Sequence, residues 1–281
     1  MKLIMTLLVR NEEDIIKENI LFHLNMGVDY FIVTDNNSVD GTPGILQDFA
    51  NEGLLHLINE KEDNYSQSAW VTRMARLAKS RFDADWIING DADEFWYSPA
   101  LDLKFTLSHI NEEISVVRVP RYDYIPIIDS EKSIFHRMII RDNKPKNHTG
   151  RPLPPKMCHR AFEEVIIDQG NHNVTYPADL KSTSDAGLEI FHFPIRSWKQ
   201  FSDKIIYGGA AYARNSELPP NIGDGWRRLY QFHLNGTLMD YFQSKILSNE
   251  EIQKGVETAK YSEDPRLRDY LVSKKIIENS K

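Results

Sequence analysis

Apolar runs alternate with segments of helical periodicity along the first part of the chain. The runs are short and continuous, as is typical of strands that are covered on both faces. They lie at residues 3–9, 30–34, 54–58 and 86–88. Between them, apolar side chains recur every three or four residues, as at Ile16, Ile20 and Leu24, and predict helices. The pattern therefore predicts strand–helix repeats and a parallel, Rossmann-like sheet.

The pattern is less regular after residue 95. We expect strands at residues 116–119, 134–140, 165–167 and 189–193, and helices at residues 102–110 and 197–214. The polar, proline-rich segment 142–155 predicts a loop, and the chain from residue 226 onwards is predicted to be mostly helical. The expected organisation is an α/β domain over residues 1–215 with a helical extension over residues 216–281 packed on it.

The composition is that of an ordinary soluble globular protein. Its 281 residues, of which 41% are hydrophobic and 27% charged, can bury a substantial core. No apolar run is long enough for a transmembrane helix, and Met1–Val9 is expected to be a first strand rather than a signal sequence. The formal charge of -7 predicts no general affinity for nucleic acid or anionic lipid. The single cysteine, Cys158, excludes an internal disulfide and favours a cytoplasmic setting.

Three carboxylates follow the buried strand that begins at Trp86. They are Asp91, Asp93 and Glu94. Ligands of open α/β sheets bind beyond the carboxyl ends of the strands. Mn²⁺ and Mg²⁺ prefer carboxylate oxygens and keep positions open for substrate phosphates. A solvated acidic turn is the commoner explanation of an isolated Asp-x-Asp, but the buried strand before it and the aromatic pair after it favour a metal and phosphate site.

Polar residues elsewhere supply candidates for a nucleotide site. Asp35 and Asn36 follow the second predicted strand, where they could contact a nucleoside or form a simple Asx-turn. Arg73 lies on the third predicted helix, either as a phosphate ligand or on a solvated face. His172 and His192 could complete a metal shell or act in proton transfer, although an isolated histidine is more often a satisfied core residue.

Four stretches together resemble the family 2 glycosyltransferases, and more narrowly the bacterial branch that is similar to family 92. They are Leu8–Glu12, Asp35–Thr42, Asp91–Phe95 and His192–Arg196. The resemblance covers about residues 1–215. It implies a GT-A fold, a nucleotide-sugar donor that is usually a UDP-sugar, and Mn²⁺ or Mg²⁺ bridging the diphosphate.

The resemblance also implies roles for single residues. Asp35 is similar to a nucleoside contact and Asp91 to a ribose or metal-side contact. Asp93 resembles the direct metal ligand and His192 the distal one, with Arg196 near the diphosphate. Lys156, together with Arg160, resembles a Lys-x-x-x-Arg segment of family 92 that meets donor or acceptor.

The catalytic base cannot be transferred from the resemblance, because the Glu-Asp pair that often carries it in family 2 is not evident. Asp168 and His172 are our candidates, since both lie in the segment expected to face the acceptor. Asp123 and Asp129 are further options. The loop 142–155 is expected to close over bound donor.

The sequence thus predicts a cytoplasmic, metal-dependent, inverting glycosyltransferase of polysaccharide biosynthesis. Its predicted acceptor is a saccharide or lipid-linked saccharide. The sequence leaves open both the oligomeric state and a peripheral association with the inner face of a membrane. The sequence leaves two alternatives. One is a metal-dependent phosphohydrolase, although Phe95 stands where phosphoaspartate enzymes usually have Thr or Val. The other is a nucleotide-sugar-binding module without turnover.

Overall fold

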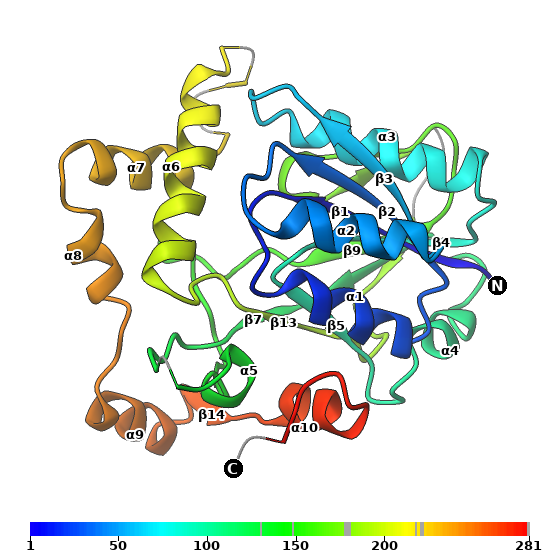
Figure 1. Ribbon diagram of the computed structural model, residues 1–281. Coiled ribbons are helices and arrows are strands. Elements are labelled where there is room, and N and C mark those ends of the chain that lie inside the picture. The colour runs from blue at the N-terminus through cyan, green and yellow to red at the C-terminus, as the bar shows by residue number, and fades with distance from the viewer. Residues whose placement is uncertain (130, 148, 177–180, 217, 220–221, 280–281) are drawn as a thin grey trace. The chain divides into compact units, whose positions relative to one another are not determined.

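The computed structural model describes residues 1–281 apart from 130, 148, 177–180, 217, 220–221 and 280–281 (Figure 1). The chain forms two compact units. The first unit is Met1–Arg121 with Pro154–Ile190, and the second is Tyr122–Leu153 with Phe191–Lys281. These units group residues by their contacts, and the division into domains at residue 215 stays a prediction.

A seven-stranded mixed sheet forms the centre of the first unit, in the order β12-β6-β9-β4-β1-β2-β3. Its strands are β1 (Leu3–Val9), β2 (Tyr30–Asn36), β3 (Leu55–Glu60), β4 (Trp86–Asp91), β6 (Val116–Val119), β9 (Lys156–Arg160) and β12 (Ser182–Thr183). Strands β1 to β4 are parallel to their neighbours among themselves, whereas β9 runs antiparallel to β4 and β6. The predicted mixed α/β fold class is therefore confirmed.

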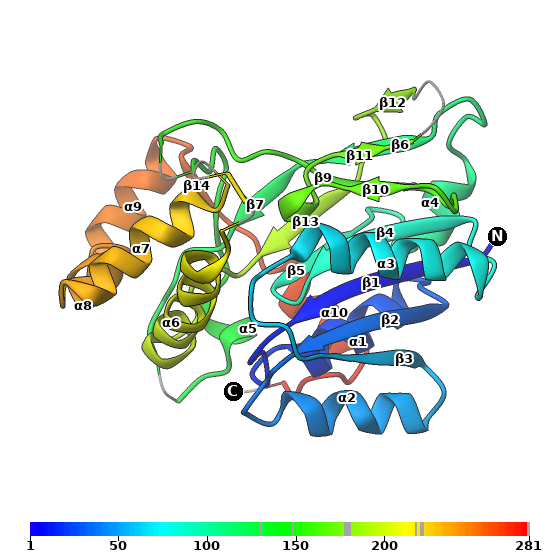
Figure 2. The ribbon, with the colours of Figure 1, turned by 90° about the horizontal axis from the view of Figure 1, so that it is seen from above.

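Helices occupy the connections between the parallel strands, as the hydrophobic periodicity predicted. They are α1 (Ile16–Asn25), α2 (Thr42–Asn51) and α3 (Gln67–Ser80). The shorter α4 (Leu103–Ser108) precedes β6. Helix α3 lies over one face of the sheet (Figure 2), where Val71, Met74 and Ala78 belong to the same buried cluster as Ile4 and Ile87. This apolar stripe explains why the segment is a helix that packs on strands buried on both faces.

Short elements complete the first unit. They are β5 (Glu94–Tyr97), β10 (Ile166–Ile167), the 3₁₀ turn η1 (Gln169–Asn171) and β11 (Val174–Thr175). Strands β7 (Arg121–Asp123) and β13 (Glu189–His192) lie where the chain passes from one unit to the other.

The second unit is mostly helical, as predicted for the end of the chain. Its helices are α5 (Ile134–Arg137), α6 (Trp198–Arg214), α7 (Asp224–Leu234), α8 (Leu238–Gln243), α9 (Asn249–Glu257) and α10 (Arg266–Ser273). Ser197 caps α6 by accepting a hydrogen bond from the Gln200 N–H at 3.1 Å. An apolar cluster that includes Phe201 and Phe242 joins α6 to α8. Among the helices that the structure describes, none has both the length and the apolar character needed to cross a bilayer.

One local prediction is wrong. The segment 134–140 is not one strand but α5 followed by β8 (Ile140–Asp142). Ile134 and Phe135 are adjacent and both buried, which suits a helical turn and not the alternation of a strand. The helical tail also contains a strand, β14 (Tyr261–Glu263), whose antiparallel pairing with β8 compensates for its short length.

Candidate donor site at the carboxyl edge of the sheet

The register of the parallel strands brings two acidic stretches to one edge. Leu8 on β1 is paired with Asp91 on β4, and the next residue, Val9, is paired with Asp35 on β2. Asp91 and Asp35 therefore lie on either side of the last residues of β1. This is the edge at which open α/β sheets bind ligands.

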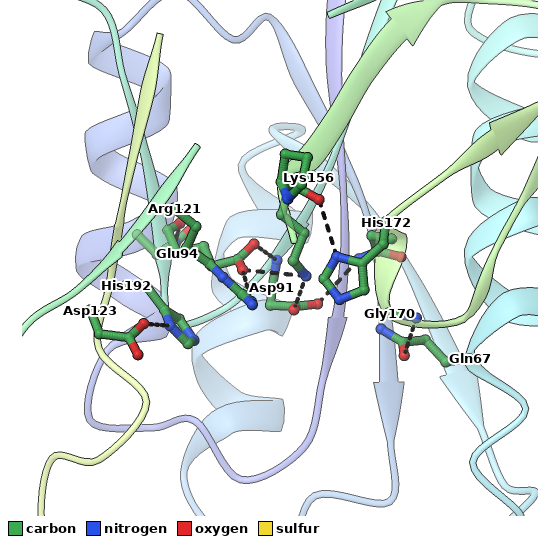
Figure 3. A network of polar contacts seen from close by, with 12 residues as sticks. Gln67, Asp91, Glu94, Arg121, Asp123, Lys156, Gly170, His172 and His192 are labelled. Carbon is green, nitrogen blue, oxygen red and sulfur yellow. Dashed lines mark hydrogen bonds and ion pairs between the residues drawn. The ribbon is translucent and has the colours of Figure 1, made fainter. Parts of the chain in front are cut away.

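A buried charge network surrounds Asp91 (Figure 3). The Lys156 ammonium donates to Asp91 Oδ2 at 2.5 Å and lies 3.3 Å from Glu94 Oε1. Arg121 donates from Nη1 to the same Glu94 oxygen at 3.0 Å. The Lys156 and Glu94 side chains are 1% and 0% exposed, so these ions depend on one another for compensation. The predicted donor-binding residues Lys156 and Asp91 are thus in direct contact.

Asn171 contacts the other oxygen of Asp91. Its side-chain amide donates to Asp91 Oδ1 at 3.2 Å, while its own Oδ1 is buried and has no hydrogen-bond partner among the described residues. The backbone of Asn171 has a positive φ of 59°, next to Gly170 with a φ of 81°. A strained backbone and an unsatisfied buried acceptor beside a carboxylate are typical of a site that a hydroxyl or amino donor of a ligand completes.

The two candidate bases lie close in sequence to Asn171. His172 is half-buried, and its Nδ1 lies 3.1 Å from the Pro155 carbonyl oxygen, an arrangement in which Nδ1 donates and Nε2 can accept. Burial lowers the pKa of His172 to about 4, and the charge of Lys156 adds to this effect. Asp168 is exposed and accepts a hydrogen bond from the Asn173 amide at 3.2 Å.

The residues at the end of β2 are held by side chains and carbonyl groups around them. Asp35 accepts from the Ser38 hydroxyl at 2.5 Å, and burial raises its pKa. Asn36 donates to the carbonyl oxygens of Glu60 and Glu62 at 3.2 and 2.7 Å, which fixes its amide against the end of β3. Both side chains are buried, at 6% and 2% exposure. Their role in nucleoside binding stays a prediction.

Arg73 has a different environment. Its side chain is 46% exposed and donates to Glu60 Oε2 at 2.9 Å. This is the arrangement expected of a solvated helix face, the alternative that the sequence left open, and a phosphate contact by Arg73 stays a prediction.

The predicted metal ligands belong to different units. Asp93 follows β4 in the first unit and is 2% exposed. In the second unit, His192 Nδ1 lies 2.6 Å from Asp123 Oδ1 (Figure 3). A carboxylate behind a ring nitrogen orients a histidine so that Nε2 faces a metal. Within the described residues, no group of three or more His, Cys, Asp or Glu side chains is placed to hold a metal ion. A carboxylate oxygen and an imidazole nitrogen are both common metal ligands, and a role for Asp93 and His192 in holding Mn²⁺ or Mg²⁺ stays a prediction.

Arg196, the predicted diphosphate contact, is fully buried in the second unit. It donates from Nη1 to the Phe193 carbonyl oxygen at 3.0 Å, and its backbone N–H donates to Gln200 Oε1. These bonds connect β13 to the start of α6. A role for Arg196 in donor binding stays a prediction.

Arg121 and Asn171 were not identified from the sequence. Arg121 follows the predicted strand 116–119, and Asn171 lies in a short polar turn, so neither has a local pattern that indicates a site. Both are distant from these carboxylates in the sequence, and only the fold brings Arg121 to Glu94 and Asn171 to Asp91.

Comparison with known sequences identifies the family. The sequence profile of glycosyltransferase family 92 matches residues 5–169, which is more than half of the chain. The chain belongs to glycosyltransferase family 92. This confirms the resemblance seen in the sequence, and the match contains the Asp35–Thr42 and Asp91–Phe95 stretches.

The chain is similar to two plant members of family 92. A family 92 protein of Ricinus communis is 22% identical over 233 residues, which are 77% of this chain and 39% of the relative. One of Oryza sativa subsp. japonica is 21% identical over 236 residues, 77% of this chain and 37% of the relative. The chain therefore spans less than two fifths of the length of these relatives.

Solved structures with some similarity include complexes with UDP. TarS of S. aureus in complex with UDP has a TM-score of 0.44 and 14% identity, with 89% of this chain and 77% of the other covered. Glucosyl-3-phosphoglycerate synthase of Mycobacterium tuberculosis, in complex with Mn²⁺, UDP and phosphoglyceric acid, has a TM-score of 0.30 and 19% identity over 43% of each chain.

Proposed function

We propose that this family 92 protein is a glycosyltransferase that moves a sugar from a nucleotide-sugar, of the UDP-sugar type, to a hydroxyl group of a saccharide or lipid-linked saccharide. Inversion at the anomeric carbon is part of the proposal. The observation that carries it is the network of Asp91, Glu94, Lys156 and Arg121 at the sheet edge that also holds Asp35. Membership of family 92 supports glycosyl transfer as the reaction.

The proposed donor lies across the ends of β1, β2 and β4. Asp35 and Asn36 would contact the nucleoside, because carboxylate and amide groups can bond to ribose hydroxyls and base edges. Lys156, with Arg73 and Arg196, would supply positive charge for the diphosphate. Asp91 would hold Lys156 in place and would contact either the ribose or the metal-bound side of the donor. The unsatisfied Asn171 Oδ1 would accept from a donor hydroxyl.

Asp93 and His192 are the residues that would hold Mn²⁺ or Mg²⁺ in a GT-A type of arrangement. Such an ion, when bound, neutralises charge on the leaving diphosphate. The Asp123 carboxylate would keep the His192 ring in orientation.

Proton removal from the acceptor hydroxyl is assigned to Asp168 or His172. His172 is neutral above a pH of about 4, so its Nε2 can accept a proton throughout the neutral range, although a base with so low a pKa is weak. Asp168 is exposed and can be reached by an acceptor. We propose that the reaction takes place in the cytoplasm. Its acceptor would be a polysaccharide or a lipid-linked saccharide on the inner face of the membrane.

The experiment that tests this proposal is a thermal-shift screen of nucleotide sugars with and without Mn²⁺. A ligand at 100 times its Kd stabilises the folded state by about 2.7 kcal/mol, which is a shift of several degrees. We expect a UDP-sugar to raise the Tm more with Mn²⁺ than without it, and Asp93→Ala to remove the metal-dependent part. Stabilisation by inorganic phosphate alone, together with hydrolysis of an aryl phosphate, would favour a phosphohydrolase instead.

A further inference from the structure

The second unit contains a cavity with a volume of about 580 Å³, and most of the residues that line it have no predicted role. Its walls come from β7, β8, β14 and the helices α6, α7 and α8, so it lies within one compact unit. Asp123 and His192 form part of the lining. A cavity of this size is in the range that holds small ligands such as a disaccharide.

Aromatic rings and lysines are paired in the lining. The Lys204 ammonium lies 6.0 Å from the centre of the Trp226 ring, Lys245 lies 4.9 Å from that of Tyr241, and Lys260 lies 4.6 Å from that of Tyr261. All six residues line the cavity. Each pair places a positive charge over an aromatic face, which is a weakly favourable contact at an exposed site.

The charge balance of the lining is positive. Besides the three lysines already named, Lys146 and Arg228 contribute cations, against the carboxylates of Asp123 and Asp142. Asp123 already interacts with His192 Nδ1 through its carboxylate. Burial raises the pKa of the other carboxyl group, Asp142.

Four of the five cations are at the exposed rim. Lys146, Arg228, Lys245 and Lys260 are exposed, and within the part of the chain that the structure describes they form no salt bridge with a carboxylate. Asp142 interacts electrostatically with Lys260 and Lys146, and Glu251 with Lys260. On a chain with 41 acidic against 34 basic residues, the lining of this cavity still has more cations than carboxylates. A cationic rim on such a protein indicates an anionic ligand.

We propose that this cavity is the acceptor site and that it selects saccharides bearing a carboxylate or phosphate group. The C–H faces of a sugar ring pack on aromatic rings such as Tyr241 and Trp226, while the ammonium groups beside those rings bind the anion. This inference rests on the proposed glycosyltransferase function and adds the charge class of its acceptor.

The test compares three disaccharides that share one scaffold and differ only in charge. Binding of cellobiose, cellobiouronic acid and a cellobiose phosphate is measured by calorimetry to the whole chain saturated with UDP and Mn²⁺. We expect at least one of the two anions to bind about fivefold tighter than cellobiose, which is the size of one exposed charge contact. The double variant Lys245→Gln and Lys260→Gln should reduce that preference to about twofold or less.

Lys274→Gln is the matched control. Lys274 is also an exposed lysine of the second unit over an aromatic ring, 5.6 Å from the centre of Tyr270, but it does not line the cavity. The control should keep the full preference for the anion. Tighter binding of the carboxylate alone assigns acidic sugars, and tighter binding of the phosphate alone assigns phosphorylated ones. Equal binding of all three disaccharides, or equal losses in the control and the double variant, overturns the proposal.

Donor binding is measured in parallel to separate this inference from the proposed function. If a UDP-sugar stabilises the protein with Mn²⁺ while the three disaccharides bind alike, only the acceptor inference fails. If no nucleotide binds while the charge preference depends on Lys245 and Lys260, the cavity is an anionic-glycan site and the transferase proposal fails.

Discussion

His23 connects helix α1 to strand β5 through both of its ring nitrogens. Nε2 accepts from the Trp96 backbone N–H at 3.0 Å, which requires that the proton be on Nδ1, and Nδ1 lies 2.8 Å from the Asn19 carbonyl oxygen. A second proton on Nε2 would face the N–H of Trp96. Burial lowers the pKa of His23 to about 3, and this geometry agrees with the shift. His159, also fully buried, has a pKa lowered by burial to about 4.

These two histidines predict acid sensitivity. Their pKa values in the folded state lie below the ordinary value of 6.5, so the unfolded chain takes up protons first as the pH falls. Their contribution to stability is complete above about pH 7 and is lost progressively as the pH falls toward the folded-state pKa values. Each can contribute a slope of about 1.4 kcal/mol per pH unit, and His172, whose pKa is also lowered to about 4, adds a third. We therefore expect the free energy of unfolding to fall by about 3 kcal/mol between pH 6 and pH 5.

Urea unfolding at pH 7.5, 6 and 5 measures this slope. His159→Phe, which keeps a flat ring, should lower the slope by about a third, and His109→Gln at an exposed position should leave it unchanged. A free energy of unfolding that is constant from pH 7.5 to 5 in the unmodified protein would show that these rings are not held neutral.

At the scale of elements, helices α6 and α7 approach one another at two glycines. A Cβ atom at Gly208 would lie 2.6 Å from the Trp226 ring, and one at Gly209 would lie 2.6 Å from Tyr230 Cβ. The glycines weaken the helix locally, but they allow the aromatic residues of α7 to pack on its backbone. Trp226 in turn lines the cavity of the second unit.

Gly209→Ala should therefore destabilise the protein, by about 1–3 kcal/mol, because overpacking outweighs the better helix propensity of alanine. Gly44→Ala in α2 is the matched control. No atom lies within 4 Å of a Cβ at Gly44, which is exposed, so we expect a gain of about 0.5–1 kcal/mol there. Chemical denaturation of both variants checks the prediction, and a Gly209→Ala protein as stable as Gly44→Ala would refute the close packing of α6 on α7.

Helices and strands of the first unit could be predicted where the same hydrophobic periodicity continues through the whole segment. The strands β1 to β4 and the helices between them have uninterrupted apolar runs or stripes, and the structure confirms them. The prediction was wrong at α5 and did not identify β14, which are three or four residues long and depend on partners distant in the sequence. Such short segments have too few residues for a period to develop.

At the scale of the whole molecule, the candidate site was predictable only in part. Parallel neighbouring strands place their carboxyl ends at one edge, so the sequence indicated that Asp35 and Asp91 lie together, and the register of β1 confirms it. The contacts that neutralise Asp91 and Glu94 come from Lys156, Arg121 and Asn171. Of these, only Lys156 had been linked to the site, through its resemblance to family 92, because pairing of β9 with β4 cannot be derived from local pattern.

The central claim is that the carboxyl edge of β1, β2 and β4 binds a nucleotide sugar and supports its turnover. Its most direct test is mass-spectrometric detection of free UDP and of glycosylated product in one reaction containing a UDP-sugar, Mn²⁺ and an acceptor. We predict that UDP formation stops when the metal is chelated and falls at least about a hundredfold in Asp93→Asn. It should persist in Asp83→Asn, because Asp83 is an exposed aspartate that follows the end of α3. UDP release by Asp93→Asn at the unmodified protein's rate, or no release from any UDP-sugar, would contradict the account.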